Sequence, residues 1–218
     1  MNELSETLIV GEDKIEKAVD VLRRGGVIGY PTETVYGLGG MAINTKVISR
    51  IQSIKGRQFH KPMLILVPDE QFISDLTDQE DIPDDVRLLM KHFWPGPLTL
   101  IFKAKNGLPK GLTSDDGGIG VRISSDPICQ DLLERCRAPI ISTSANPANQ
   151  PPARTADDVR RYFKDHLDII LDGGVRNMNE PSTVIDVRSM PARLIRQGAI
   201  EVFLIKSTIG EIIVSENM

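Results

Sequence analysis

The chain has little of what membrane proteins, disulfide scaffolds and zinc proteins need. No apolar run in its 218 residues approaches the roughly 18 residues that a membrane helix requires. Its two cysteines, Cys129 and Cys136, fall on one predicted helix about two turns apart, roughly 10 Å, which is too far for a mutual disulfide. Its three histidines lack the spacing of zinc ligands. We expect no membrane span, no internal disulfide and no metal site built from protein side chains.

Basic residues are slightly outnumbered by acidic residues. Lysine and arginine number 26 against 30 aspartates and glutamates, so the net charge is −4 and the pI is about 5.5. This balance argues against a generally basic nucleic-acid binder without excluding a local basic cleft. Residues 1–6 are acidic and show no signal-peptide pattern, so a cytoplasmic location is expected.

Three common catalytic signatures are missing. The sequence has no G-x-x-x-x-G-K-[ST] phosphate loop and no G-x-S-x-G nucleophile elbow. The stretch Gly37-Leu38-Gly39-Gly40 follows the first predicted strand but lacks the last glycine of a dinucleotide-binding turn. These absences argue against Walker-type nucleotide hydrolysis, classical dinucleotide binding and α/β-hydrolase chemistry.

What is present is an alternation of helical and strand patterns, typical of one α/β domain. Helices are expected at residues 15–22, 45–54, 86–93 and 155–163, and from residue 126 through Cys136, with Asn44 and Thr155 as N-caps. Strands are expected at 27–30, 63–67, 98–103, 119–123, 138–141, 169–171, 183–187 and 193–196. We predict one domain over residues 1–206. Residues 207–218 are expected as a C-terminal tail, either loose or forming a short extra element.

A hydroxyl-rich turn, Ser142-Thr143-Ser144-Ala145-Asn146, follows the apolar strand that ends at Ile141. Ligands of α/β folds bind at such strand ends. Upstream, Lys55-Gly56-Arg57 and Lys61 place cations before another apolar strand, and together these groups suggest an anion site for phosphate. Plainer explanations exist: hydroxyls form turns, and cations at a helix end complement its dipole.

Two arginines stand inside otherwise apolar strands. Arg122 lies in Gly120-Val121-Arg122-Ile123 and Arg196 in Leu194-Ile195-Arg196. A charge there is costly unless it is paired, so each either faces solvent or binds a carboxylate in bidentate fashion. The stretch from Pro31 to Gly39 is either a turn with a solvated Glu33 or a pocket wall where Thr34 offers its hydroxyl.

Taken together, these motifs resemble the YrdC/Sua5 family of threonylcarbamoyl-AMP synthases, in the short single-domain form. The matching stretches begin with Tyr30-Pro31-Thr32-Glu33-Thr34-Val35-Tyr36-Gly37-Leu38-Gly39 and Lys55-Gly56-Arg57 through Pro62. They continue with Trp94-Pro95-Gly96-Pro97-Leu98-Thr99, Val121-Arg122, Ser142-Thr143-Ser144-Ala145-Asn146, Ser182-Thr183-Val184-Ile185-Asp186, and Arg196 with Gly198. The resemblance implies a three-layer α/β fold, with a twisted mixed sheet, helices on both faces and an open cleft.

The resemblance also implies a function: L-threonine, bicarbonate (or CO2) and ATP yield threonylcarbamoyl-AMP and pyrophosphate, for modification of adenosine 37 in tRNA by transfer proteins. It implies that L-threonine is bound by Thr34, Arg122, Ser142 and Ser182. It implies that ATP, with Mg²⁺, is bound by Lys55, Arg57, Lys61, Ser144, Asn146 and Arg196. Lys55 and Arg57 would be catalytic, because they stabilise the charge that builds on the phosphates.

Three positions depart from the longer family members, which place a histidine at Leu66, a threonine at Gly118 and often an asparagine at Lys61. Two other functions are alternatives to the synthase. One is a non-catalytic RNA-binding protein of the same fold, against which the acidic pI counts. The other is an enzyme like dihydroxybutanone-phosphate synthase, which needs an acidic metal-binding cluster that this sequence lacks.

Overall fold

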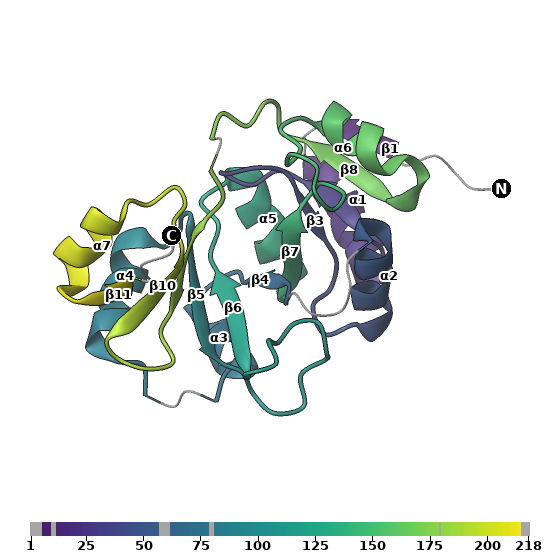
Figure 1. Cartoon of the computed structure of the whole chain (residues 1–218). Coiled ribbons are helices and arrows are strands. Elements are labelled where there is room, and N and C mark those ends of the chain that lie inside the picture. Colours follow the sequence, from purple (N-terminus) through teal and green to yellow (C-terminus); the bar gives the residue numbers. More distant parts are fainter. Residues whose placement is uncertain (1–5, 10–11, 57–61, 79–80, 179, 215–218) are drawn as a thin grey trace.

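Eleven strands form one mixed sheet in the part of the chain that the computed structural model describes, residues 6–9, 12–56, 62–78, 81–178 and 180–214. The strand order is β1-β8-β2-β3-β7-β4-β6-β5-β9-β10-β11, so β1 and β11 lie at opposite edges (Figure 1). The strands are β1 (Glu6–Ile9), β2 (Ile28–Tyr30), β3 (Gly37–Gly39), β4 (Leu64–Leu66), β5 (Leu98–Lys103), β6 (Gly118–Arg122), β7 (Ile140–Ser144), β8 (Ile169–Asp172), β9 (Thr183–Asp186), β10 (Ala192–Arg196) and β11 (Ile212–Val214).

Seven α-helices and two short 3₁₀ turns connect these strands within the described residues. The helices are α1 (Glu12–Arg23), α2 (Thr45–Lys55), α3 (Ile73–Leu76), α4 (Asp84–Phe93), α5 (Pro127–Cys136), α6 (Ala156–Phe163) and α7 (Val202–Ile209), and the 3₁₀ turns are Glu70–Phe72 and Lys164–His166. No helix of the described residues is long and apolar enough to cross a membrane.

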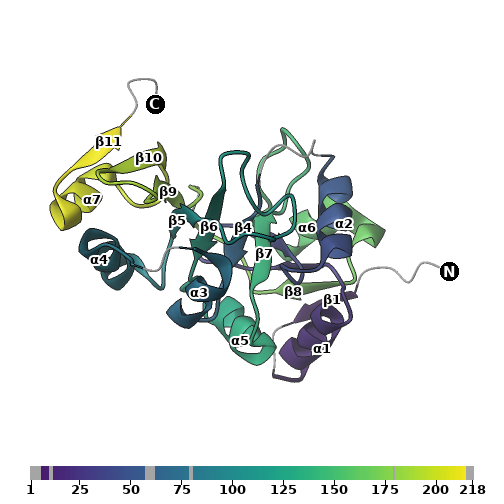
Figure 2. The ribbon, with the colours of Figure 1, turned by 90° about the horizontal axis from the view of Figure 1, so that it is seen from below.

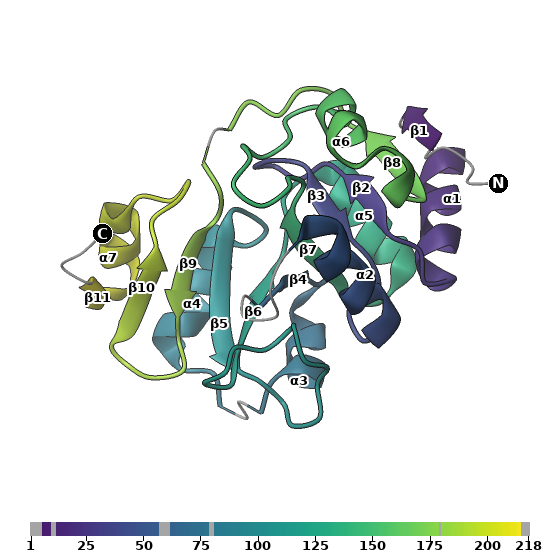
Figure 3. The same cartoon turned by 45° about the vertical axis from the view of Figure 1, so that its right-hand side comes forward.

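Helices cover both faces of the sheet, as alternate residues of β8 show. Ile169 and Leu171 belong to a buried cluster with α1 and α5, whereas Ile170 belongs to the cluster that contains α2 and α6. Figure 2 shows α1 and α5 on one side of the strands and α2 and α6 on the other. In Figure 3, α4 lies behind β5, whose Leu100 shares the same buried cluster as the helix. The predicted three-layer mixed α/β fold is confirmed.

Local sequence signals account for the helix ends. The Asn44 side chain accepts from the backbone amides of Lys46 and Val47, as predicted for an N-cap. Thr155 and Asp158 form a capping box at the start of α6. Gly56 ends α2 in the left-handed conformation with φ 63°. These caps fix where α2 and α6 begin and where α2 ends, and thus where the neighbouring loops enter the site.

Strand β3 was not expected from the sequence, and it pairs antiparallel with both β2 and β7. Its sequence Gly-Leu-Gly has little strand propensity. Close packing explains the glycines, because a Cβ at Gly39 would lie 2.5 Å from the Tyr30 ring. A larger residue at Gly39 would clash with Tyr30, so this close approach of the strands requires glycine at that position.

Regular elements continue past the position where a tail was predicted to start. The boundary between residues 206 and 207 falls inside α7, and β11 then pairs in parallel with β10. Ile205 and Ile212 are buried in the main core. Of the two forms expected for residues 207–218, the structure shows the extra element as far as Val214.

Candidate active site

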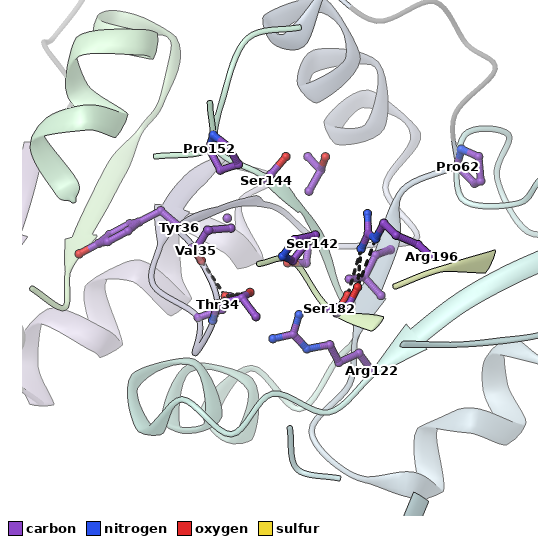
Figure 4. A pocket seen from close by; sticks show the side chains of 15 residues that line it. Thr34, Val35, Tyr36, Pro62, Arg122, Ser142, Ser144, Pro152, Ser182 and Arg196 are labelled. Atoms are coloured by element: carbon purple, nitrogen blue, oxygen red, sulfur yellow. Dashed lines mark hydrogen bonds between the residues drawn. The ribbon is translucent and has the colours of Figure 1, made fainter. Parts of the chain in front are cut away.

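A cavity of about 310 Å³ opens where the ends of several strands meet (Figure 4). Its wall includes the loop after β2, the ends of β6, β7 and β10, and the segment that leads into β9. Fifteen residues line it: Thr32, Thr34, Val35, Tyr36, Gly37, Pro62, Leu64, Arg122, Ser142, Thr143, Ser144, Pro152, Pro181, Ser182 and Arg196.

Six of the residues predicted from sequence come together here. The cavity is lined by Thr34, Arg122, Ser142 and Ser182 of the predicted threonine set, and by Ser144 and Arg196 of the predicted ATP set. They come from five separate segments of the chain, and Figure 4 shows their side chains around one space. The cavity therefore combines two cations with several small hydroxyls, a set suited to a polar anionic ligand.

Arg122 is buried at the end of β6, and its charge is paired inside the protein. Its Nε donates to the Gly96 carbonyl at 3.1 Å, and an Nη atom lies 2.5 Å from Oε1 of Glu33. The Arg122 Nη2 and Glu33 Oε1 atoms are both buried, and their contact is an ion pair without the angles of a hydrogen bond. The other oxygen of Glu33 accepts from Ser124 at 2.5 Å. Glu33, which was expected to be solvated if its loop were only a turn, is therefore the internal partner of Arg122.

The turn from Trp94 to Leu98 supplies the Gly96 carbonyl. The Trp94 indole N–H donates to the Leu98 carbonyl at 2.7 Å, and the Gly96 amide donates to the Ile123 carbonyl at 2.8 Å. The second bond ties the turn to the residue that follows Arg122. This turn and Glu33 therefore hold the guanidinium from two sides.

Thr34 is fixed by its own loop. The Thr32 and Thr34 hydroxyls lie 3.0 Å apart, and the Thr32 hydroxyl donates to the Val35 carbonyl at 2.6 Å. Because that bond uses the only hydrogen of Thr32, the Thr34 hydroxyl is the donor between the two threonines. Because Thr34 lines the cavity, its hydroxyl oxygen can still accept a hydrogen bond from a ligand.

Arg196 and Ser182 form one unit at the opposite wall (dashed lines in Figure 4). The guanidinium donates to the Ser182 carbonyl at 2.9 and 3.2 Å and to the Ser182 hydroxyl at 3.2 Å. Burial lowers the pKa of Arg196, and the nearby positive charge of Arg122 lowers it further. An anion bound between the two arginines would relieve this repulsion.

The remaining predicted ATP residues lie beside the cavity or outside the described residues. Lys55, at the end of α2, is buried and donates from Nζ to the Ser144 carbonyl. The Asn146 amide donates to the carbonyls of Pro147 and Gln150, at 3.0 and 2.6 Å, and so shapes the loop after β7. Arg57 and Lys61 are outside the described residues, so their predicted roles stay predictions.

Two of the departures noted in the sequence lie in different surroundings. Leu66 is buried in the cluster of α1 and α5. Gly118 lines a second, more apolar hollow of about 200 Å³, which adjoins the cavity because Pro62, Leu64 and Arg196 line both. A Cβ at Gly118 would meet Ile101 and Ser114 at 2.8 Å, so a larger residue there would require both side chains to move.

The sequence matches a known family over most of its length. The Sua5/YciO/YrdC family model, described as "Telomere recombination", matches residues 20–198. The chain belongs to this family. It is 34% identical over 203 residues to threonylcarbamoyl-AMP synthase of Pyrococcus abyssi, a match that covers 93% of this chain and 59% of that protein. It is 36% identical over 172 residues to threonylcarbamoyl-AMP synthase of Hahella chejuensis, covering 79% of this chain and 92% of that protein.

The fold of this chain is similar to that of a solved relative. The crystal structure of P. abyssi Sua5 complexed with L-threonine matches with a TM-score of 0.90 at 33% identity, covering 96% of this chain and 62% of that chain. The chain therefore spans less than two thirds of the length of the Pyrococcus protein. The family predicted from the motifs is confirmed.

Several contacts that shape this family member's cavity were not expected from the sequence. They are the pairing of Glu33 with Arg122, the bond of Arg122 to the Gly96 carbonyl, and the contact of Thr99 with Ser182. A signal existed for the first, because a buried arginine in an apolar strand needs a carboxylate. The sequence does not say which of its acidic residues lies close enough in space.

Proposed function

We propose that the chain is an L-threonylcarbamoyladenylate synthase, which converts L-threonine, bicarbonate or CO2, and ATP to threonylcarbamoyl-AMP and pyrophosphate. The observation that carries the proposal is the cavity in which Thr34, Arg122, Ser142 and Ser182 meet beside Ser144 and Arg196. The relatives from P. abyssi and H. chejuensis carry the name threonylcarbamoyl-AMP synthase, and P. abyssi Sua5 was solved in complex with L-threonine, which supports the same function here.

The threonine would lie with its carboxylate toward Arg122. Figure 4 shows this guanidinium directed into the cavity. Its contacts with Glu33 and the Gly96 carbonyl fix its orientation before the substrate arrives. Such preorganisation lowers the cost of binding. The hydroxyls of Thr34, Ser142 and Ser182 would contact the polar groups of the amino acid.

The reaction then needs a carbamate and an activated phosphate. The ammonium group of threonine gives up two protons to solvent as its nitrogen bonds to the carbon of CO2, and a carbamate oxygen then attacks the α-phosphorus of ATP while pyrophosphate leaves. Negative charge grows on the departing phosphates, and cations at that place stabilise it. Lys55, which donates to the Ser144 carbonyl, and Arg196, which lines the cavity, are described cations that would do so. Arg57 and Lys61 would join them.

Mg²⁺ would enter the cavity bound to ATP, with most of its ligands supplied by the nucleotide and water and few by the protein. Mg²⁺ prefers hard oxygen ligands and often takes most of them from phosphates and water. Among the described residues no group of three histidine, cysteine or acidic side chains could hold a metal ion, and Glu33 already contacts Arg122 and Ser124. The ion would neutralise charge on the triphosphate. A cytoplasmic location, transfer proteins and tRNA as the final acceptor belong to the same proposal.

The deciding experiment incubates the purified protein with ATP, Mg²⁺, bicarbonate and labelled pyrophosphate, with and without L-threonine. We expect threonine-dependent exchange of label into ATP and the adenylate in the mass spectrum, with a much smaller signal for serine. Arg122→Ala should abolish the threonine-dependent exchange of label, because the variant lacks the guanidinium that would bind the carboxylate. A folded wild-type protein that forms no adenylate, yet binds RNA with strong salt dependence, would overturn the proposal in favour of a non-catalytic RNA-binding protein.

A further inference from the structure

The Ser182 hydroxyl has two polar neighbours in the described part of the chain. Arg196 donates to it at 3.2 Å, and the Thr99 hydroxyl lies 2.8 Å away. Ser182 lines the main cavity, whereas Thr99 reaches it from β5 and lines the adjoining hollow. Both residues are buried, with 2% and 4% of their surface exposed, so their hydrogen bonds are shielded from bulk water.

The direction of these hydrogen bonds follows from counting hydrogens. A serine or threonine hydroxyl has one hydrogen and two lone pairs, and an arginine can only donate. Arg196 therefore occupies one lone pair of Ser182. If Ser182 donated to Thr99, the hydrogen of Thr99 would be left facing the more apolar adjoining hollow, where no described residue accepts it, and an unsatisfied donor in apolar surroundings is costly. If Thr99 donates to Ser182, both lone pairs of Ser182 are filled, and its hydrogen is left for the cavity.

We propose that Thr99 is a positioning residue that makes the Ser182 hydroxyl a hydrogen-bond donor toward an oxygen of the bound amino acid. The inference rests on the proposed function, since it assigns Ser182 to L-threonine. Thr99 acts through Ser182 and does not touch the substrate. Because Thr99 donates to Ser182, the Ser182 hydroxyl already points its hydrogen toward the cavity before the substrate arrives. We therefore expect Thr99 to affect the binding of the amino acid and not the binding of ATP.

The test compares Thr99→Val, which has the same shape without the hydroxyl, with Thr99→Ser, which keeps the hydroxyl. We expect Thr99→Val to raise the KM and the calorimetric Kd for L-threonine about five- to tenfold, with the KM for ATP and kcat within about twofold of wild type. Thr99→Ser should recover wild-type affinity. In the Ser182→Ala background, Thr99→Val should add no further loss, because the group that it orients is gone.

Thr77→Val is the matched control. Thr77 is also buried, at 5% exposure, and its hydroxyl has no partner in the described structure. This variant should leave both KM values unchanged. Equal affinity of folded Thr99→Val and wild type for L-threonine, or equal losses for threonine and ATP, would overturn the inference. A wild-type protein that neither binds L-threonine nor forms adenylate would instead overturn the proposed function, so the two failures are distinguishable.

Discussion

Glu33 and Arg122 form a buried ion pair, with 2.5 Å between Oε1 and a guanidinium nitrogen. Glu33 follows β2 and Arg122 ends β6, and three strands, β3, β7 and β4, lie between those two in the sheet. The side chains are 12% and 4% exposed. The pair therefore connects distant strands. It also balances the charge of Arg122, which lines the cavity.

Breaking this pair should cost more stability than neutralising both partners. In Glu33→Gln, Arg122 is left buried without a counter-charge, so we expect the free energy of unfolding to fall by about 3–5 kcal/mol. The double variant Glu33→Gln/Arg122→Met removes both charges and should be more stable than Glu33→Gln. Urea denaturation followed by circular dichroism measures both. Asp157→Asn, in an exposed pair with Arg160, should change stability by less than about 1 kcal/mol. Wild-type stability in Glu33→Gln would contradict the argument.

Much of the fold was predictable because its signals are local. The strand expected at residues 98–103 matches β5, and the caps at Asn44 and Thr155 lie where predicted. Alternation of apolar residues and capping side chains depends only on near neighbours in sequence. The strand order of the sheet has no such local signal, and it was expected only in general form from the family resemblance.

The candidate site was predictable in part for the same reason. Motifs identified Thr34, Arg122, Ser142 and Ser182, and the structure places all four around one cavity. The partners of these residues lie far away in sequence. Glu33 meets Arg122 across three strands, and Thr99 meets Ser182 from the neighbouring strand β5. Pairing and burial decide such contacts, and neither can be read from local spacing.

Both cysteines should be unreactive in the native protein. Burial raises the pKa of Cys136 to about 11 and that of Cys129 still further. The thiolate is the reactive form, so at pH 8 about one Cys136 in a thousand would be ionised, against roughly a quarter of unperturbed thiols. We expect slow reaction with DTNB in buffer and rapid reaction of two thiols in guanidinium chloride.

The pH dependence gives a second check on these thiols. Raising the pH from 8 to 9 should speed the native reaction of Cys136 about tenfold, because the thiolate fraction grows tenfold per unit below the pKa. Cys129→Ala, which keeps Cys136, should react faster than Cys136→Ala, which keeps the fully buried Cys129. Equal native rates for the two variants would show that burial does not control their reactivity.

Asp126 has two separable roles at the start of α5. Its Oδ1 accepts from the amides of Ile128 and Cys129 at 3.0 Å, and its Oδ2 contacts Arg176. Asp126→Asn keeps the cap but loses the charge pair, whereas Asp126→Ala loses both. We expect the stability order wild type, Asp126→Asn, Asp126→Ala, with the second step costing about 1 kcal/mol. Thermal and urea unfolding measure the order. Equal stability of the two variants would show that the N-cap hydrogen bonds of Asp126 do not contribute to stability.

Lys55 offers the sharpest test of catalysis, because its cation is fixed beside the cavity by the Ser144 carbonyl at the end of β7. Lys55→Met keeps the length and apolar stem of the side chain but removes the charge. The lost cation would no longer stabilise negative charge on the phosphates, so adenylate formation should fall by about 10²-fold or more. L-threonine binding by Arg122 and its hydroxyl neighbours should persist, which calorimetry would show. Lys46→Met, on the exposed first turn of the same helix, is the control and should retain full activity. If Lys55→Met forms adenylate at the wild-type rate, Lys55 supports the loop after β7 and the phosphate charge must be stabilised by other cations.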